Sequence, residues 1–370
     1  MNAITSTLMT ASNQWASRPA DQRFTSLTDI LAYKRTLRAR SRSTVISTKQ
    51  LEVQPVGTDH KGIQVVNRVT GNAAAPSHYS FGQLATLAKA PAGYLRTLPS
   101  EMAADCINYG LLARDVEEVG LYLQKPDQDV TLAAATGPNY GRIFDADIVA
   151  ALVDRFGDGV TGAFRVPGIF GAPLDRVTSQ DTTLYASDRD CFIFLADEAN
   201  RIEVPGRRDG QPGSLARGFF VWNSEVGNAT FGIQTFLFDY VCKNRIVWGA
   251  QDVKKMTIRH TSGAPDRYIH EVAPALIQYA NSSTRSITEA LAAARTKKID
   301  DDVNDFLAAR RFTRSQVAAI QATHELEEGR PIETLWDAAT GITAYARQFV
   351  NTDTRIDLER QAGDIFAMAS

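Results

Sequence analysis

Cysteine and histidine are scarce in this sequence, and their spacing matches no common metal site. The three cysteines, Cys106, Cys191 and Cys242, lie far apart in apolar runs, and the chain contains five scattered histidines. A structural zinc site needs a close group of such ligands, and the chain has no CxxC or HExxH motif. Buried free thiols in a reducing compartment explain the cysteines best. The sequence therefore predicts a cytoplasmic protein with no metal and no cofactor.

Signatures of several enzyme classes and of membrane insertion are also missing. The chain has no GxxxxGK[ST] or GxSxG sequence, which mark many ATPases and esterases. No stretch approaches the roughly 18 uncharged apolar residues of a spanning helix. The beginning of the chain lacks the basic and apolar regions of a secretory signal. We therefore expect no membrane partner and, from the missing motifs, a protein without enzymatic activity.

The overall charge is nearly balanced, so a nucleic-acid site would have to be a local patch. The chain has 40 basic and 42 acidic residues and a formal net charge of −2, which gives no general attraction for a polyanion. The strongest basic block is the acid-free stretch "YKRTLRARSR", with Lys34, Arg35, Arg38, Arg40 and Arg42. We expect the first three to share an exposed helix face and the last two to mark its exit. Phosphate binding and a solvated helix face both explain this block.

The order of apolar patterns predicts an α+β fold. Between residues 43 and 265, strand-like and helix-like segments intermix without the regular alternation of a doubly wound sheet. This irregular order of segments favours a core built on a mixed, mainly antiparallel sheet. From residue 266 onward, successive amphipathic segments predict helices alone. We expect three regions: an N-terminal arm and basic helix (1–42), an α+β core (43–265) and an all-helical C-terminal third (266–370).

Residues with strong capping preferences mark several expected helix ends. Ser26 or Thr28 is expected to cap the helix "LTDILAYKRTLRAR". The spacings Ser80–Gln83 and Thr313–Gln316 match the capping box, in which each partner bonds the other's backbone. In the last third of the chain, apolar spacing places Trp336 on an inward-facing side.

Three acidic residues are candidates for a catalytic or metal-binding group. Asp188 and Asp190 stand at the entrance of the strand expected from "CFIFL", and carboxylates in such places hold Mg²⁺ in some nucleases. Glu225 lies in the bend "NSEVGN", between a strand and a helix expected from "ATFGIQTFLFDYVC". The alternative interpretation is structural: Arg189 pairs with its acidic neighbours, and Glu225 favours the dipole of the following helix.

Four stretches resemble a known family. They are "QWASRPADQRFTSLTDI", "TTLYASDRDCFIFL", "FFVWNSEVGNATFGIQTFLFDYVCKNRIVWG" and "LWDAATGITAYARQF". Together they resemble the phage- and plasmid-associated family known as domain of unknown function 932, most densely over residues 115–270. The resemblance implies a protein carried by mobile elements. It implies no established reaction and no catalytic residues.

These observations lead to three hypotheses about function. The first is an accessory protein of a phage or plasmid that binds or anneals single-stranded DNA, or binds duplex DNA, as a homo-oligomer. A helix-turn-helix outline in "QLATLAKAPAGYLRTL" adds a second, weaker pointer to DNA. The second hypothesis is a metal-dependent nuclease or phosphoryl-transfer enzyme that uses the three acids. The third is a protein-binding antagonist of host defence.

Overall fold

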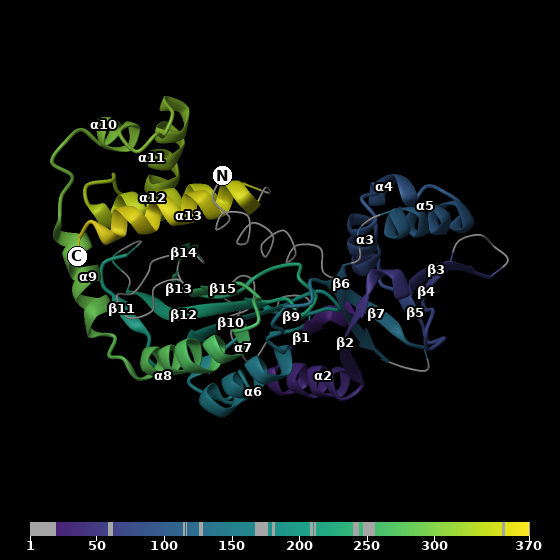
Figure 1. Cartoon of the computed structure of the whole chain (residues 1–370). Coiled ribbons are helices and arrows are strands. Elements are labelled where there is room, and N and C mark those ends of the chain that lie inside the picture. Colours follow the sequence, from purple (N-terminus) through teal and green to yellow (C-terminus); the bar gives the residue numbers. More distant parts are fainter. Residues whose placement is uncertain are drawn as a thin grey trace.

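The chain folds into two β-sheets that lie next to each other, with helices on both sides of them (Figure 1). The structure is a computed structural model, and it describes residues 20–57, 62–113, 115, 117–125, 129–166, 177–179, 182–207, 210, 212–239, 244–246, 256–349 and 352–369. The sheets are mixed and mainly antiparallel, and helices follow from residue 264 onward. The α+β class and the helical C-terminal region predicted from the sequence are therefore confirmed. Residues 1–19 of the expected N-terminal arm lie outside the described residues.

The larger sheet is built around three long neighbouring strands. Its order is β1-β9-β10-β12-β13-β14, with β8, β11 and β15 paired at its margins, and every pairing is antiparallel. The strands are β1 (Arg23–Phe24), β8 (Phe164–Arg165), β9 (Leu184–Ala186), β10 (Cys191–Asp197), β11 (Ile202–Val204), β12 (Gly213–Asn223), β13 (Phe231–Asp239), β14 (Asn244–Ile246) and β15 (Met256–Ile258).

The smaller sheet is strongly curved because its two edge strands follow each other in the chain. Its order is β2-β6-β7-β5-β4-β3, and three residues, Thr48–Gln50, join β2 to β3. Edge strands of a flat six-stranded sheet would lie about 24 Å apart, whereas this connection spans about 14 Å at most. The sheet must therefore curl. Its strands are β2 (Ser41–Ser47), β3 (Leu51–Val56), β4 (Gly62–Asn67), β5 (Ala73–Pro76), β6 (Glu118–Gln124) and β7 (Thr131–Thr136).

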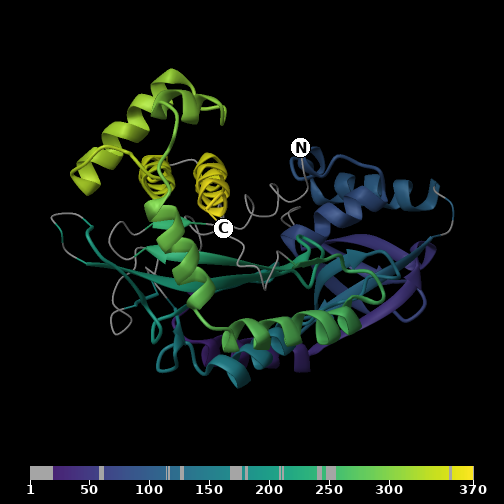
Figure 2. The ribbon, with the colours of Figure 1, turned by 90° about the vertical axis from the view of Figure 1, so that its left-hand side faces the viewer.

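The helices form groups on the two sides of the sheets (Figures 1 and 2). Helices α2, α6 and α8 lie on one side, and α3 to α5 and α11 to α13 lie on the other, at opposite ends of the molecule. The helices are α2 (Leu27–Ala39), α3 (His78–Leu87), α4 (Ala92–Leu95), α5 (Ser100–Ala113), α6 (Asp145–Phe156), α7 (Ala264–Arg267), α8 (Ala273–Asn281), α9 (Arg285–Thr296), α10 (Val303–Ala308), α11 (Arg314–Glu328), α12 (Leu335–Ala346) and α13 (Thr352–Ala367).

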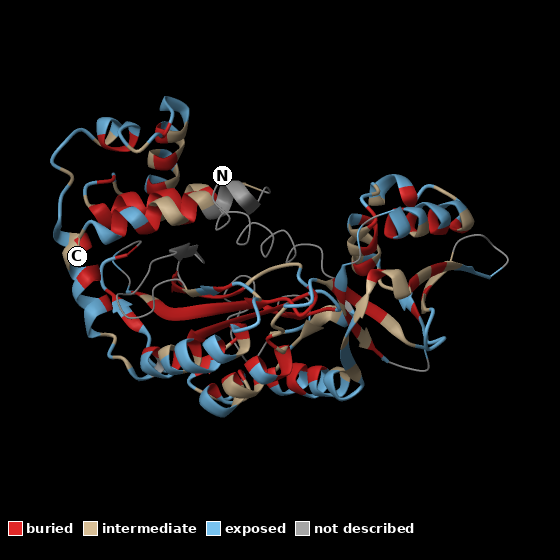
Figure 3. Cartoon of the chain, viewed as in Figure 1, coloured by how far each residue is buried: buried red, intermediate tan, exposed pale blue. Residues whose placement is uncertain are grey.

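Both faces of the larger sheet are buried, as Figure 3 shows for its central strands. Along β12, Phe219 packs with the core under α2, α6 and α8, while its neighbour Phe220 points to the opposite face. That opposite face carries a cluster of buried aromatic side chains. These rings are core residues, so they do not form an exposed platform for stacking bases.

The prediction of a helix after the bend at Glu225 is wrong, because residues Phe231–Asp239 form strand β13. Side chains of β13 are buried on both faces of the sheet, so the run lacks the polar alternation of a half-buried strand. Apolar runs of this kind do not distinguish strand from helix. Gly232 fits the strand because the Trp222 side chain of the paired strand β12 lies against it. A Cβ atom at this position would lie 2.0 Å from the Trp222 ring. The bend is therefore a turn between two antiparallel strands.

Two of the expected helix starts are confirmed and one is wrong. Ser26 caps α2, and Thr313 with Gln316 forms a complete capping box on α11. Helix α3 begins one turn earlier than expected, because the Ser77 hydroxyl, not Ser80, accepts the capping hydrogen bond. The helix-turn-helix outline also fails, since α4 has four residues and is too short to read a DNA groove.

None of the helices that the structure describes has the length and apolar character required to cross a lipid bilayer.

Trp336 should anchor the C-terminal helices. It is 1% exposed, and its ring centroid lies 6.1 Å from that of Phe366 on α13. Because truncation would leave a large cavity, we expect Trp336→Ala to lower the free energy of unfolding by about 3–5 kcal/mol in denaturant titrations. Leu326→Ala, at a position 76% exposed on α11, is the control and should change it by less than about 0.5 kcal/mol. Equal effects would contradict this assignment.

Candidate nucleic-acid interface

The basic block runs along the second half of α2 and into β2, and its members do not share one environment. Arg35, Arg40 and Arg42 are exposed. Arg38 is partly engaged, since it forms an ion pair with Asp147 and its guanidinium lies 4.2 Å from the Phe144 ring centre. The side chains of Arg35 and Arg42 thus remain available to an anion from solution.

Lys34 does not belong to this exposed group. It is 5% exposed, and its Nζ lies 2.8 Å from Asp145 Oδ2 and donates to the Ser187 carbonyl at 2.9 Å. The expectation that Lys34, Arg35 and Arg38 share an exposed face is therefore wrong. Lys34 lies on the same helical stripe as the apolar residues Leu27, Ile30 and Leu31. A lysine on that stripe has to bring its ammonium group into the interior.

The partner of Lys34 belongs to a buried polar network between the two sheets. Asp145 opens α6, and its Oδ1 accepts a hydrogen bond from Asn223 Nδ2 at 2.6 Å. Its backbone N–H donates to Glu225 Oε1 at 2.8 Å, and Tyr122 donates its hydroxyl to Glu225 Oε2 at 2.8 Å. Asn223 and Glu225 come from the larger sheet and its turn, and Tyr122 from β6 of the smaller sheet. The network joins α2, α6 and both sheets.

The network also shifts the acid–base behaviour of its members. Burial would lower the pKa of Lys34, but Asp145 and Glu225 outweigh burial and raise it, so the ammonium stays charged. Burial, and then the charge of Asp145, raise the pKa of Glu225 above its ordinary value, although Lys34 opposes them. Burial and the neighbouring Glu225 raise the pKa of Tyr122 to about 12. The phenol therefore remains a hydrogen-bond donor at neutral pH.

The three candidate acids have different surroundings. Asp188 is exposed and lies 3.8 Å from the Arg189 guanidinium, whereas Asp190 is buried and accepts a hydrogen bond from Ser187 at 2.8 Å. Glu225 is 8% exposed and uses both carboxylate oxygens within the network. Among the described residues, no three acidic, histidine or cysteine side chains are grouped so that they could hold a metal ion.

Two further features bear on cofactor binding. A pocket of about 550 Å³ beside the turn after β12 has Arg96 and Arg189 in its wall, and none of its described lining residues is acidic. It could hold a small anion. The stretch Gly157–Gly162 matches GxGxxG, but it follows helix α6 rather than a strand. It therefore lacks the context of a dinucleotide-binding loop.

No pattern in the sequence indicated that Asp145, Asn223 and Tyr122 would be partners of the candidate residues. The hydrogen bond between Tyr122 and Glu225 spans 103 residues, and the bond from Asp145 to Glu225 spans 80. One local signal was present: an acidic residue at the beginning of an amphipathic helix, as at Asp145, is favoured by the helix dipole.

Comparison with known proteins identifies a family for about half of the chain. The model of a family described as "Domain of unknown function (DUF932)" matches residues 182–368. The matched segment begins just before β9 and contains most of the larger sheet and the C-terminal helices. Neither a curated protein nor a solved structure matches the chain.

Lys34 and Arg35 are adjacent basic residues whose replacement should lower stability by very different amounts. Lys34→Gln leaves the buried Asp145 carboxylate without its cation, so the free energy of unfolding should fall by about 3–5 kcal/mol. Arg35→Gln changes an exposed side chain and should cost less than about 0.5 kcal/mol. Denaturant titration of both variants measures the difference. Similar small losses would refute the buried ion pair.

The raised pKa of Glu225 predicts a defined dependence of stability on pH. The folded protein holds this proton more tightly than the unfolded chain, so the contribution of Glu225 favours folding below its unfolded pKa of about 4.3. That contribution is lost as pH rises through the raised folded pKa. The free energy of unfolding of the wild type, minus that of Glu225→Gln, should therefore decrease as pH rises from about 4 towards neutrality. A difference that stays constant or increases would contradict the raised pKa.

Proposed function

Since the chain belongs to the DUF932 family, whose description assigns no activity, we propose a function from the physical properties of its surface. The protein is a cytoplasmic, non-enzymatic accessory factor of a phage or plasmid that binds single-stranded DNA through arginines of α2 and β2. The mobile-element setting is suggested by the family resemblance. The binding activity is supported by the arginines themselves.

The observation that carries this proposal is that the side chains of Arg35 and Arg42 are unpaired. Both side chains are exposed and form no hydrogen bond or ion pair with any part of the chain that the structure describes. Elsewhere on the surface, Arg267 and Arg285 are paired with glutamates one helical turn away. An unpaired guanidinium loses no internal partner when it contacts a phosphate. The acid-free stretch from Tyr33 to Arg42 thus has a surplus of available positive charge.

The surroundings of the arginines favour contacts to the backbone of a single strand. In the described chain, the helix-turn-helix outline has no recognition helix, so we expect little dependence on base sequence. Tyr33 is 37% exposed and stands two helical turns before Arg40 on the same side of α2. An exposed ring can stack on an unpaired base, which a duplex does not offer. Single strands should therefore bind more tightly than duplexes of equal length.

The salt dependence of binding tests the proposal. Each phosphate contact to a single strand contributes about 0.7 to the slope of log affinity against log salt. Arg35→Gln, Arg40→Gln and Arg42→Gln together should therefore reduce that slope by about two units, for every oligonucleotide sequence alike. Fluorescence anisotropy with a labelled oligonucleotide at several salt concentrations measures it.

A second triple variant controls for net charge. Arg259, Arg311 and Arg314 are also exposed but lie outside the basic block, and their replacement by Gln should leave the slope unchanged. If the wild type shows no affinity for single strands at low salt, or if both variants lose equally, the proposal fails. If binding persists in the first variant but is lost in Glu225→Gln, the acid-based alternative becomes the better explanation.

A further inference from the structure

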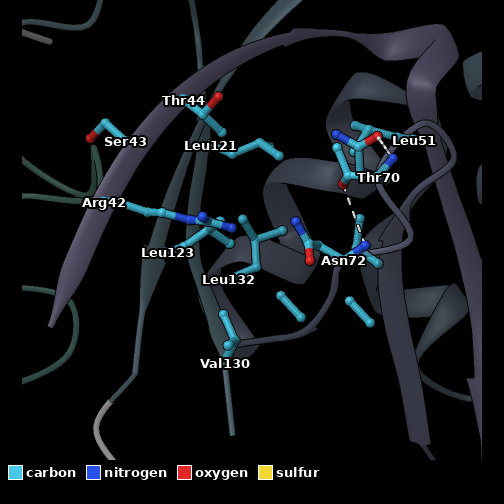
Figure 4. A pocket seen from close by; sticks show the side chains of 14 residues that line it. Arg42, Ser43, Thr44, Leu51, Thr70, Asn72, Leu121, Leu123, Val130 and Leu132 are labelled. Carbon is cyan, nitrogen blue, oxygen red and sulfur yellow. Dashed lines mark hydrogen bonds between the residues drawn. The ribbon is translucent and has the colours of Figure 1, made fainter.

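The curved smaller sheet contains a pocket of about 400 Å³ whose lining comes from all six of its strands (Figure 4). Such a volume is within the range of small-molecule sites, which commonly occur in the mouths of barrel-like sheets. The wall is mainly aliphatic, with side chains from β3, β4, β6 and β7 and from the residue before β7: Leu51, Val65, Leu121, Leu123, Val130 and Leu132.

The pocket continues the hydrophobic core between this sheet and helices α3 and α5. Leu51, Val65 and Leu132 belong both to the pocket wall and to that core. Farther from the core, Leu123 and Val130 are only partly buried. The concave face is therefore covered by helices along part of its length and remains open beside β2. An aliphatic ligand would extend the core into this space and remove the partly exposed wall from water.

One charged group enters this aliphatic space. Figure 4 shows the Arg42 side chain reaching from β2 into the pocket beside Leu123, with Thr70 and Asn72 on the opposite side. The Arg42 side chain has no hydrogen bond or ion pair in the described chain, and none of the described lining residues is acidic. A guanidinium pairs with a carboxylate through two parallel hydrogen bonds. The pocket thus combines an aliphatic wall with a single unpaired cation.

We propose that this pocket binds a small aliphatic carboxylate, with its hydrocarbon body against the leucine and valine wall and its carboxylate on Arg42. The single cation matches the single charge of a carboxylate, whereas a phosphate monoester would bring additional charge without a second cation to receive it. Binding of a carboxylate in this pocket is a different function from the DNA binding proposed above, although both would use the Arg42 side chain. An occupied pocket would compete with a phosphate for this side chain.

Octanoate and its uncharged analogue octanol test the proposal by titration calorimetry with the full-length protein. The wild type should bind octanoate more tightly than octanol. Arg42→Gln should weaken octanoate about tenfold or more, because a charge-assisted pair is lost, and should leave octanol within about twofold. Equal weakening of both ligands, or no octanoate binding by the wild type, would overturn the proposal.

Two neighbouring residues of β2 provide a matched pair of blocking variants. Thr44 lines the pocket and is paired with Leu121, another residue of the wall, whereas Val45 is exposed and does not line the pocket. Thr44→Phe should abolish binding of both ligands, and Val45→Phe should leave both unchanged. The reverse pattern, or an equal loss in both, would place the ligand elsewhere. Since neither residue belongs to the basic block, Thr44→Phe should keep the wild-type salt slope for single strands, so the two proposals can fail independently.

Discussion

The ion pair between Lys34 and Asp145 is the interaction on which the packing of helices α2 and α6 against the larger sheet depends. Both side chains are almost completely buried, and a buried charge is tolerated when its partner and further hydrogen bonds replace water. Asp145 meets this condition through Lys34 and Asn223, and Lys34 through the carbonyl of Ser187. Because these partners come from separate elements, none can move independently without leaving a charge unpaired. The exposed arginines of α2 are therefore presented from a helix held in a fixed position.

This constraint also explains the role of Glu225. Its turn joins the two longest strands of the larger sheet, and its carboxylate reaches the beginning of α6 and the Tyr122 hydroxyl of the smaller sheet. The acid thus acts as a connection between sheets. Its position near Asp145 has an electrostatic cost, which Lys34 reduces. The three charged groups belong to one unit, and the properties of any one depend on the other two.

The sequence predicted those features that depend on local pattern. The α+β class, the C-terminal helices and the Thr313–Gln316 cap follow from periodicity and capping chemistry, which act over a few residues. β13 was mistaken for a helix because both of its faces are buried and its residues show no alternation. Lys34 was assigned to the surface because its charge suggested exposure, while its partner lies over a hundred residues away. The pocket exists because the smaller sheet is curved, and the degree of curvature of a sheet cannot be predicted from the sequence pattern of its strands.

The long sequence separation within the polar network has a consequence for the order in which the chain can fold during synthesis. Tyr122 and Lys34 emerge from the ribosome well before Glu225, so the smaller sheet and α2 can form before their polar partners are all present. Lys34 meets Asp145 and Ser187 earlier in synthesis, but Asp145 still lacks the Asn223 amide and the Tyr122 hydroxyl still lacks its acceptor. The turn after β12 then supplies the Glu225 carboxylate, which accepts from both the Asp145 N–H and the Tyr122 hydroxyl. The polar contacts between the two sheets are therefore completed only after residue 225 has been synthesised.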